Sequence, residues 1–338
     1  DIKPVNSVFK KNDILVALNQ NTIKQNLAEL NSGGALIYDS DKVKVSPAKL
    51  KNDHVQNIGI PLTSIAKEAG GELMRNVVAL GATMYLVGQK LTIANKVVKE
   101  TFSKKGKKIV DNNLKALKAG YDFVKENSKD EFMCQLPTLA AKDNIFITAN
   151  ESMALGAVAG GLGFYAAYPM TPSSSILHYL AKIASKTGLV VKHAEDEISV
   201  ANMALGASHM GARSMVATSG GGFALMTETL GLMGLTETPM VLINVQRGGP
   251  ATGLPTWTEQ ADLQFMLHAA QGDFPRIVMA PGDAGEAFEM GHQALNWADM
   301  YQAPVLILSD KLIGEGNTTV PRFNTKNVKI YRGKILTQ

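Results

Sequence analysis

The stretch "GFYAAYPMTPSSSILHYLAKIASK", Gly163–Lys186, decides the fold of this chain. A short apolar run stops at a threonine–proline step and then opens into an amphipathic segment. Proline suits the first position of a helix, and threonine is a good N-cap. The sequence therefore predicts a strand that ends at Met170, a cap at Thr171 and a helix that begins at Pro172. A helix N-terminus that follows a strand can hold an anion, although the simpler interpretation is a capped helix that binds only water.

Strand–turn–helix units of this kind recur from Ile145 onward. Their strands are aliphatic runs without polar alternation, which is typical of a parallel sheet covered by helices on both faces. The sequence therefore predicts an α/β fold with a doubly wound parallel sheet. The predicted strands are 163–170, 189–194, 214–219, 240–247, 276–281 and 303–310.

Polar and glycine-rich segments follow several of these strands. Ligands of an open parallel sheet bind beyond the carboxyl ends of its strands. That rule places Thr171 and the acidic triplet Glu195–Glu197 along one edge of the sheet. Ser219, followed by Gly220–Gly222, and Arg247 come after later strands and belong to the same edge. Because several segments converge there, the edge is the predicted ligand site.

The acidic triplet has two interpretations. Asp196 can cap a helix, and Glu197 at the first helical position can interact with the helix dipole, so the triplet can be no more than a helix start. However, three adjacent carboxylates repel one another, and the small residues of 201–208 indicate that the helix after them is closely packed. A carboxylate at the end of a buried helix favours a specific partner, which makes Glu197 a candidate site residue.

The glycine run and the arginine also have two interpretations each. "TSGGG", Thr218–Gly222, lacks the lysine of a P-loop and the G-x-G-x-x-G spacing of a dinucleotide site. Tight packing of a helix against a strand is therefore favoured over a phosphate cradle. Arg247 is either a surface arginine or, because glycines and prolines flank it in a region of low charge, a bidentate clamp for a carboxylate.

The first half of the chain begins with another strand–helix–strand pattern. "DILVALN", Asp13–Asn19, predicts a strand, and 20–30 predicts a helix that is stopped by the glycines of "NSGG". Ala35–Asp39 then predicts a second strand, parallel to the first. A loop is expected around Ile60–Pro61, and the pattern beyond it is helical. The helical spacing is clearest at Leu114, Leu117, Tyr121 and Val124.

Composition limits the classes of function. The 338 residues are 45% hydrophobic and 19% charged with a formal net charge of +4, which suggests two domains with sizeable cores. The single cysteine, Cys134, excludes a disulfide framework and any iron–sulfur cluster or zinc site made by this chain alone, and it fits a cytoplasmic location. No metal site is predicted, because no histidine pair has metal-ligand spacing with an acid.

Neither a nucleic acid nor a membrane is expected as a partner of this chain. The basic run Lys104–Lys108 is not interleaved with aromatic residues, as a nucleic-acid groove would be. It is either a solvated helix face or a patch for an anionic cofactor or an acidic partner. Every long apolar stretch is interrupted by Gly, Pro or polar residues, so no membrane span is expected.

Four spaced motifs together resemble the α subunit of the 2-oxoacid:ferredoxin oxidoreductases, thiamine-diphosphate enzymes that make acyl-CoA. The motifs are "YPMTPSS", "EDEISVANMALGAS", "TSGGGFALM" and "VQRGGPATGLPTWTEQADL", and the form is close to the 2-oxoglutarate type. Four segments of the first half resemble the γ domain, which in this subtype is fused ahead of the α part: "DILVALNQNTI", "GGALIYDS", "RNVVALGA" and "LKALKAGYDFV".

The resemblance implies a division into domains. Residues 1–126 would form a Rossmann-like γ domain, and 127–144 a linker. Residues 145–318 would form the pyrimidine-binding domain for thiamine diphosphate, and 319–338 a tail toward a further domain. The family also has a glycine-rich unit before the point where this chain begins. The chain is therefore expected to be a fragment, or one piece of a split subunit.

The resemblance also assigns roles to the predicted edge. Glu197 would hydrogen-bond N1′ of the aminopyrimidine and favour the imino tautomer, whose nitrogen removes the C2 proton. Arg247 would hold the 1-carboxylate of the 2-oxoacid, with Thr171 beside the same group. The residues implied to contact the cofactor are Glu197, Pro169, Ser219 and Gly220.

A partner β subunit is implied by what this chain lacks. The pyrophosphate and its Mg²⁺ need a G-D-G…N site, and "GDAGEAF" offers only the first two letters. The [4Fe-4S] cluster would also lie in the β subunit, because Cys134 alone cannot hold one. CoA would be the co-substrate and ferredoxin the electron acceptor, with a dimer of αβ units as the assembly.

The reaction implied is oxidative decarboxylation of 2-oxoglutarate with CoA to succinyl-CoA and CO₂. Pyruvate and branched-chain 2-oxoacids remain alternative substrates. A decarboxylase or a transketolase-like enzyme would share the glutamate but differ in the "YPMTP" step and in the arginine. A non-catalytic assembly subunit of the same fold remains an alternative of another class.

Overall fold

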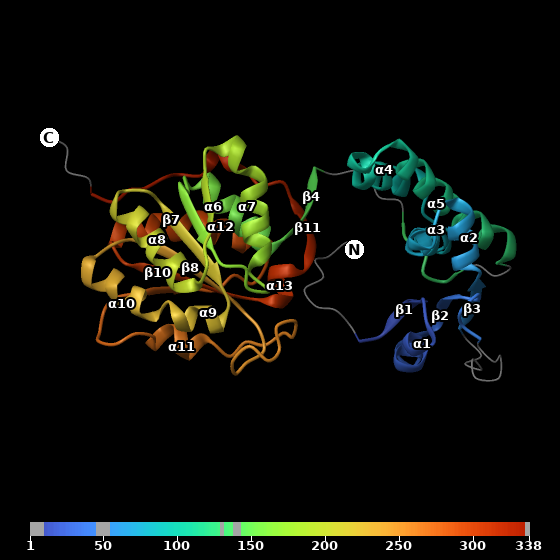
Figure 1. Cartoon of the computed structure of the whole chain (residues 1–338), viewed down its shortest axis with the longest axis horizontal. Coiled ribbons are helices and arrows are strands. Elements are labelled where there is room, and N and C mark those ends of the chain that lie inside the picture. The colour runs from blue at the N-terminus through green and yellow to red at the C-terminus, as the bar shows by residue number, and fades with distance from the viewer. Residues whose placement is uncertain (1–9, 45–54, 129–131, 138–142, 335–338) are drawn as a thin grey trace. The chain divides into compact units, whose positions relative to one another are not determined.

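The computed structural model describes residues 10–44, 55–128, 132–137 and 143–334. The chain divides into an N-terminal unit, Asp1–Ala141, and a C-terminal unit, Lys142–Gln338, each with its own core (Figure 1). The domain boundaries expected from sequence stay predictions. Parts of the expected linker and tail, at 129–131, 138–142 and 335–338, lie outside the described residues.

The N-terminal unit is built on a parallel sheet of three strands in the order β1-β2-β3. The strands are β1 (Asn12–Ala17), β2 (Leu30–Asp39) and β3 (Gln56–Ile60), and α1 (Gln20–Asn26) with a 3₁₀ turn connects the first two. The predicted parallel strand–helix–strand unit is confirmed. The remaining helices are α2 (Leu62–Ala69), α3 (Arg75–Leu86), α4 (Leu91–Phe102) and α5 (Lys107–Asn127).

Alternating side chains of β2 face two separate cores. Ala35 and Ile37 pack with residues of α2, α3 and α5, whereas Leu36 packs with Ile23 of α1 on the other face. Figure 1 shows α1 on one side of these strands and α2, α3 and α5 on the other. The sheet is therefore covered on both faces, as the sequence predicts.

Two sequence predictions for this unit are wrong. The glycines of "NSGG" do not stop a helix, because α1 ends at Asn26 and both glycines lie in β2. A side chain on Gly34 would place its Cβ 2.8 Å from the carbonyl oxygen of Asp13, so the glycine allows two strands to approach closely. The segment before Pro61 is also a strand, β3, and not only a loop. β3 lies at the edge of the sheet and contains polar residues, so its sequence is not the apolar run that predicts a buried strand.

The C-terminal unit is built on six parallel strands in the order β6-β5-β7-β8-β10-β9. This confirms the parallel sheet predicted from the aliphatic runs. The strands are β5 (Phe164–Ala167), β6 (Val190–His193), β7 (Ser214–Thr218), β8 (Met240–Gln246), β9 (Ile277–Met279) and β10 (Pro304–Asp310).

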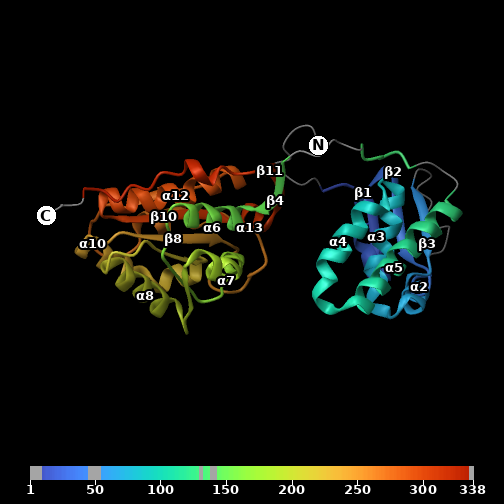
Figure 2. The ribbon, with the colours of Figure 1, turned by 90° about the horizontal axis from the view of Figure 1, so that it is seen from above.

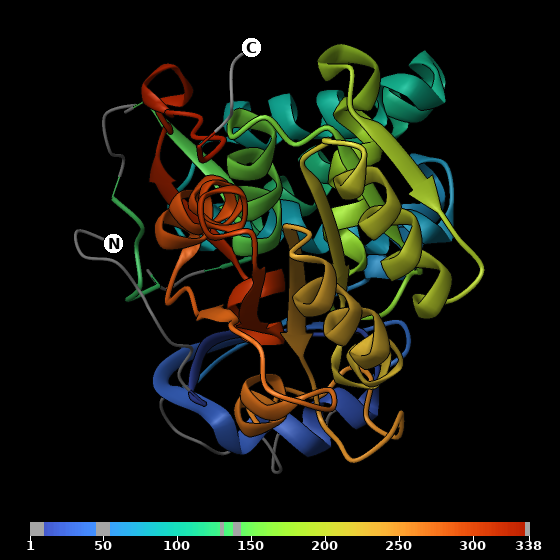
Figure 3. The same ribbon diagram turned by 90° about the vertical axis from the view of Figure 1, so that its left-hand side faces the viewer.

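Helices cover both faces of this sheet. One core joins the strands to α6 (Ala149–Ala159), α7 (Ser174–Thr187) and α12 (Ala284–Tyr301). The other joins them to α8 (Glu197–His209), α9 (Gly220–Leu225), α10 (Thr227–Thr236) and α11 (Leu263–His268). Figures 2 and 3 show α12 and α10 on opposite sides of β8 and β10. The unit is doubly wound.

A smaller element lies beside this sheet. β4 (Asn144–Thr148) pairs antiparallel with β11 (Asn317–Pro321). In the sequence, β4 comes before the strands of the six-stranded sheet and β11 comes after them. The short helix α13 (Lys311–Glu315) leads from β10 to β11. The residues after β11 continue along the same unit, where the backbone oxygen of Tyr331 accepts a hydrogen bond from Arg213.

Strand order places a topological switch point between β5 and β7, at the predicted edge. The chain runs from β5 outward to β6 and then crosses back to β7 on the other side of β5. Neighbouring connections therefore leave β5 and β7 in opposite directions, and such a switch point opens a crevice at the carboxyl ends of the two strands. The loops after β5 and β7 carry Thr171 and Ser219, respectively.

The connection from β5 to α7 differs from the sequence prediction. The strand ends at Ala167, and α7 begins at Ser174 with Ser173 as its N-cap residue, so Thr171 does not cap the helix and Pro172 does not open it. The Ser173 amide donates to the Met170 carbonyl at 2.9 Å, and the Thr171–Pro172 peptide bond is cis. A turn with a cis-proline at its third position therefore comes before the helix.

Candidate active site

Glu197 lies at the first position of α8, where the sequence places it. The Asp196 carboxylate accepts a hydrogen bond from the Ser199 amide at 2.7 Å, which confirms the predicted cap and lowers the pKa of Asp196. Glu197 itself is only 4% exposed, and its Oε1 has no hydrogen-bond partner among the described residues. A buried carboxylate oxygen without a donor costs free energy unless a ligand supplies one.

The wall behind Glu197 is made by the glycine run. A Cβ on Gly222 would lie 2.7 Å from Cγ of Glu197 and 2.0 Å from Oγ1 of Thr218. Only glycine therefore lets α9 approach the carboxylate this closely. This confirms the tight-packing interpretation of Thr218–Gly222.

α8 is less buried than its small residues suggest. Ala201 and Ala204 are buried against the sheet, but Gly206 is exposed, and so are Ile198 and Met203. The helix therefore buries one face only. The small residues allow that face to approach the strands closely.

Arg247 directly follows β8 at the same carboxyl edge of the sheet. It is 8% exposed, and its Nη1 donates to the carbonyl oxygen of Thr171 at 2.7 Å. Burial lowers the pKa of Arg247, and the Glu197 carboxylate opposes that shift. A guanidinium keeps its proton in a protein, which leaves a buried positive charge at the carboxyl edge of the sheet.

Thr171 joins the site through its backbone. Its carbonyl oxygen, rather than a helix-capping hydroxyl, binds Arg247. The structure therefore brings together Glu197, Arg247 and Thr171, from the connections after β6, β8 and β5.

Of the other predicted contact residues, Ser219 and Gly220 lie in the connection after β7, and Pro169 lies in the connection after β5. Ser219 is fully buried, and its Oγ has no hydrogen-bond partner among the described residues. Gly220 opens α9, and a Cβ there would lie 2.6 Å from Oδ2 of Asp262. Pro169 is exposed in the loop between β5 and α7.

Polar residues that the sequence analysis did not single out hold the loop after Arg247. Asp262 accepts a hydrogen bond from Nδ2 of Asn244 at 2.9 Å, and its amide donates to Oε1 of Gln246 at 2.9 Å. Gln246 in turn donates to the carbonyl of Ser309 in β10. The sequence contains a pattern that could have identified two of these residues. Asn244 and Gln246 are polar residues at alternate positions of an otherwise apolar strand, so they share one face of it.

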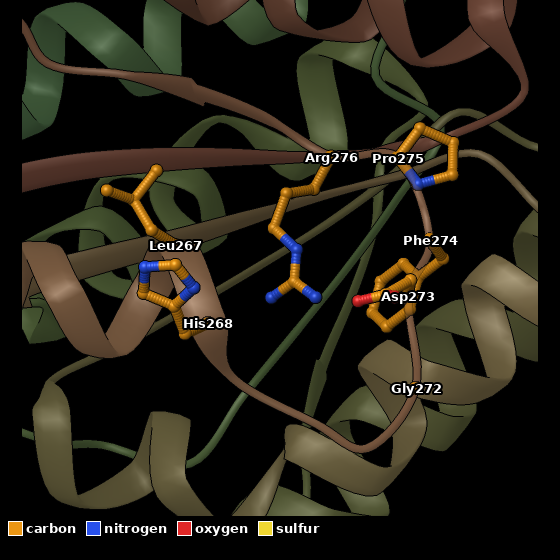
Figure 4. Close-up of a pocket in the computed structure, with 7 residues that line it drawn as sticks. All are labelled: Leu267, His268, Gly272, Asp273, Phe274, Pro275 and Arg276. Atoms are coloured by element: carbon orange, nitrogen blue, oxygen red, sulfur yellow. The ribbon is translucent and has the colours of Figure 1, made fainter.

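A hollow of about 510 Å³ lies at the opposite edge of the sheet, just before β9 (Figure 4). Arg276 projects into it between His268 and Phe274, with its guanidinium 4.2 Å from the centre of the Phe274 ring. Nη1 of Arg276 donates to the carbonyls of Met266 and Ala269. Arg276 therefore binds carbonyl groups in and just after α11, and the hollow belongs to the amino edge rather than to the candidate site.

The remaining sequence candidates lie elsewhere. Lys104–Lys108 is exposed at the turn between α4 and α5 of the N-terminal unit. In the described ranges no group of three His, Cys, Asp or Glu side chains is arranged to hold a metal ion. Among the helices of the described residues, none is both long and apolar enough to cross a membrane.

Comparison with known proteins identifies the family. Residues 155–335 match the family described as pyruvate flavodoxin/ferredoxin oxidoreductase, thiamine-diphosphate-binding. This chain belongs to that oxidoreductase family. Residues 1–123 match a second family description, pyruvate ferredoxin/flavodoxin oxidoreductase, so both units resemble parts of these enzymes.

Two curated relatives of this oxidoreductase chain are 34% and 40% identical to it over the parts that match. The 2-oxoglutarate oxidoreductase subunit KorA of Mycobacterium tuberculosis is 34% identical over 90% of this chain and 50% of its own length. The 2-oxoglutarate synthase subunit KorA of Methanothermobacter thermautotrophicus is 40% identical over 51% of this chain and 46% of its own length. The chain thus spans about half the length of the curated relatives it matches.

A solved structure has the same fold as this member of the oxidoreductase family. The 2-oxoglutarate:ferredoxin oxidoreductase from Magnetococcus marinus, with 2-oxoglutarate, coenzyme A and succinyl-CoA bound, is 37% identical with a TM-score of 0.88. The match covers 96% of this chain and 56% of that chain. The resemblance stated from sequence is therefore confirmed at the level of family and fold.

Proposed function

We propose that this chain is the α part of a 2-oxoglutarate:ferredoxin oxidoreductase. In that reaction 2-oxoglutarate and CoA give succinyl-CoA and CO₂, and the electrons released reduce ferredoxin. The observation that carries the proposal is that two buried charged groups lie at the carboxyl edge of the sheet: the Glu197 carboxylate, whose Oε1 has no hydrogen-bond partner among the described residues, and the Arg247 guanidinium. The printed names of the relatives and of the solved structure support the substrate.

The residues present fit the pyrimidine end of thiamine diphosphate. Glu197 Oε1 and Ser219 Oγ are buried polar atoms without partners among the described residues, and both lie in connections that bound the crevice. A heteroaromatic ring with ring nitrogen and amino groups can satisfy such atoms. When bound, this cofactor supplies the carbanion chemistry at its thiazolium ring. Glu197 would hold a proton at N1′ of the pyrimidine and so act as a general acid–base group.

Arg247 is suited to hold the 1-carboxylate of the 2-oxoacid. The Thr171 carbonyl accepts a hydrogen bond from Nη1, and the other donors of the fork have no hydrogen-bond partner among the described residues, so they are available to a carboxylate. The Glu197 carboxylate interacts with the same guanidinium, so the substrate would lie next to the proton-holding group. Glycines 248 and 249 directly follow Arg247 and carry no side chains that would obstruct it.

The rest of the reaction requires a partner subunit. Within this proposal a β subunit holds the pyrophosphate with Mg²⁺ and the [4Fe-4S] cluster, because the sequence offers one cysteine and an incomplete pyrophosphate motif. Ferredoxin then takes electrons from the cluster of the partner. The assembly proposed is a dimer of αβ units in the cytoplasm.

A substrate panel on the complex reconstituted with its β subunit tests the proposal. CoA-dependent viologen reduction is followed with 2-oxoglutarate, pyruvate and a branched-chain 2-oxoacid. We expect the highest kcat/KM for 2-oxoglutarate. A higher value for pyruvate or the branched-chain acid would assign a different 2-oxoacid, and no turnover with any of the three would support a non-catalytic subunit.

A further inference from the structure

Asn150 is a buried polar residue outside the proposed cofactor and substrate contacts. It occupies the second position of α6, after the N-cap Thr148, and is fully buried. Its amide Nδ2 donates to the carbonyl oxygen of Pro172 at 2.9 Å and to Oγ of Ser175 at 2.9 Å. The side chain thus reaches from α6 to the loop between β5 and α7.

The orientation of the Asn150 amide is determined by its neighbours. A proline carbonyl can only accept a hydrogen bond, so the amide nitrogen rather than the oxygen must face it. The amide oxygen points to α13, where a Cβ on Gly314 would lie 3.0 Å from Asn150 Oδ1. The Asn150 side chain therefore lies between α13 and the loop, and its Oδ1 has no hydrogen-bond partner among the described residues.

The loop that Asn150 holds also orients Arg247. Three successive carbonyl oxygens of this loop each have a defined donor. The Met170 oxygen accepts from the amide of Ser173, the Thr171 oxygen from Nη1 of Arg247 at 2.7 Å, and the Pro172 oxygen from Asn150 at 2.9 Å. Asn150 therefore fixes the peptide directly next to the one that binds the guanidinium.

We propose that Asn150 is a positioning residue for substrate binding, acting through the Thr171–Pro172 backbone on the orientation of Arg247. The inference rests on the proposed function, in which Arg247 binds the carboxylate of the 2-oxoacid. Loss of the Asn150 amide donor frees the Pro172 carbonyl, and the Thr171 carbonyl then no longer holds the guanidinium in one orientation. Ground-state binding of the carboxylate weakens, so KM rises more than kcat falls.

The test uses the complex with its β subunit and two variants, Asn150→Ala and Asn150→Asp. The aspartate keeps the size of the side chain and suits the N-terminal turn of α6, but it removes both N–H donors. The matched control is Ser175→Ala, which removes the other acceptor of the same amide and leaves the Pro172 bond in place. The measurements are Tm, the dissociation constant for thiamine diphosphate, and KM and kcat for 2-oxoglutarate.

We expect both Asn150 variants to raise KM for 2-oxoglutarate about five- to tenfold, the effect of one hydrogen bond, with kcat lowered less than about threefold. Affinity for thiamine diphosphate should be unchanged, and Ser175→Ala should keep the wild-type KM. Wild-type KM in a folded Asn150 variant would overturn the inference. An equal rise of KM in Ser175→Ala would do so as well.

A double-mutant cycle with Arg247→Ala separates positioning from general loosening of the fold. If Asn150 acts through Arg247, Asn150→Ala adds less than about twofold to KM in the Arg247→Ala background. A full additional five- to tenfold rise there would overturn the inference but not the proposed function. If Arg247→Ala alone leaves KM unchanged, the role of Arg247 in the proposed function fails, and the inference fails with it.

Discussion

Three separate segments contribute to the environment of Glu197, whose buried Oε1 has no hydrogen-bond partner among the described residues. Asp196 fixes the start of α8, and the absent side chain of Gly222 lets α9 come within contact of the carboxylate. Arg247 supplies the nearby positive charge. A carboxylate that only started a helix would be solvated, so its burial favours a role toward a ligand.

Arg247→Ala tests the substrate contact at the residue scale. We expect KM for 2-oxoglutarate to rise about 10- to 100-fold with a smaller change in kcat, because a charge-assisted hydrogen bond shared by ground and transition states is lost. Steady-state kinetics of the reconstituted complex measures this. Arg322→Ala is the control, since Arg322 is an exposed arginine of the same unit whose Nε bonds Asp143. An unchanged KM in Arg247→Ala would remove Arg247 from the substrate site.

Gly222→Ala tests the close approach behind Glu197. The added methyl group would meet Cγ of Glu197 and Oγ1 of Thr218 well inside contact distance, so the carboxylate must move. A displacement of about 1 Å at a reacting group can lower the rate about 10²-fold, and we expect a loss of that order in kcat/KM. Gly221→Ala is the matched control, because a Cβ there is 3.6 Å from Thr252 Oγ1, an ordinary contact. Equal activities of the two variants would contradict the packing argument.

Sequence patterns identified some of these residues and not others. Glu197 was recognisable as the residue after a helix cap, and Arg247 as a lone charge flanked by glycines and prolines. Asn150 and Asp262 were not recognisable, because their partners lie in segments distant in sequence. Local patterns do not encode which distant segments meet.

At the scale of elements, the hydrogen bonds of a buried arginine connect four segments of the C-terminal unit. Arg213, just before β7, donates from Nε to Oδ2 of Asp299 in α12 at 2.9 Å. It also donates to the carbonyl oxygens of Gly160, after α6, and Tyr331, after β11. Burial lowers the pKa of Arg213, and the Asp299 carboxylate counteracts this shift. The cluster lies at the amino edge of the sheet, opposite the candidate site.

Asp299→Ala should destabilise the C-terminal unit without changing the substrate site. It leaves the buried Arg213 charge without its carboxylate, a loss of about 3–5 kcal/mol, and a unit of this size should lose roughly 6–20 °C in Tm. Arg332→Ala is the control, because Arg332 is more exposed and lies 3.2 Å from the same carboxylate. Thermal unfolding measures Tm, and KM for 2-oxoglutarate should stay at the wild-type value below the transition. A Tm within about 2 °C of wild type would contradict the buried-pair argument.

The positions of the six parallel strands in the C-terminal unit followed from sequence because buried parallel strands are uniformly apolar, whereas β4, α6 and β11 were not predicted. The wrong predictions have local causes. The β5–α7 connection contains a turn with a cis-proline, which sequence does not distinguish from a capped helix start. In the N-terminal unit the glycines of "NSGG" allow strand approach rather than helix termination, because Gly34 packs against the backbone of Asp13.

At the scale of the whole molecule, the fold class could be predicted and the strand order could not. Repeated strand–turn–helix units require a parallel sheet, but the order β6-β5-β7-β8-β10-β9 depends on long-range packing. That order creates the switch point beside β5, where the site residues converge. Each of the two units has separate cores, and the chain spans about half the length of its curated relatives.

The most direct test of the central claim is the rate of deuterium exchange at C2 of thiamine diphosphate bound to the reconstituted complex. We compare wild type with Glu197→Gln, and use Glu195→Gln, an exposed neighbour, as control. If Glu197 holds the proton at N1′, Glu197→Gln slows exchange at least about 10²-fold and abolishes 2-oxoglutarate-dependent viologen reduction, with assembly intact. Glu195→Gln keeps the wild-type rate. Exchange at the wild-type rate in an assembled, cofactor-loaded Glu197→Gln complex would contradict the account.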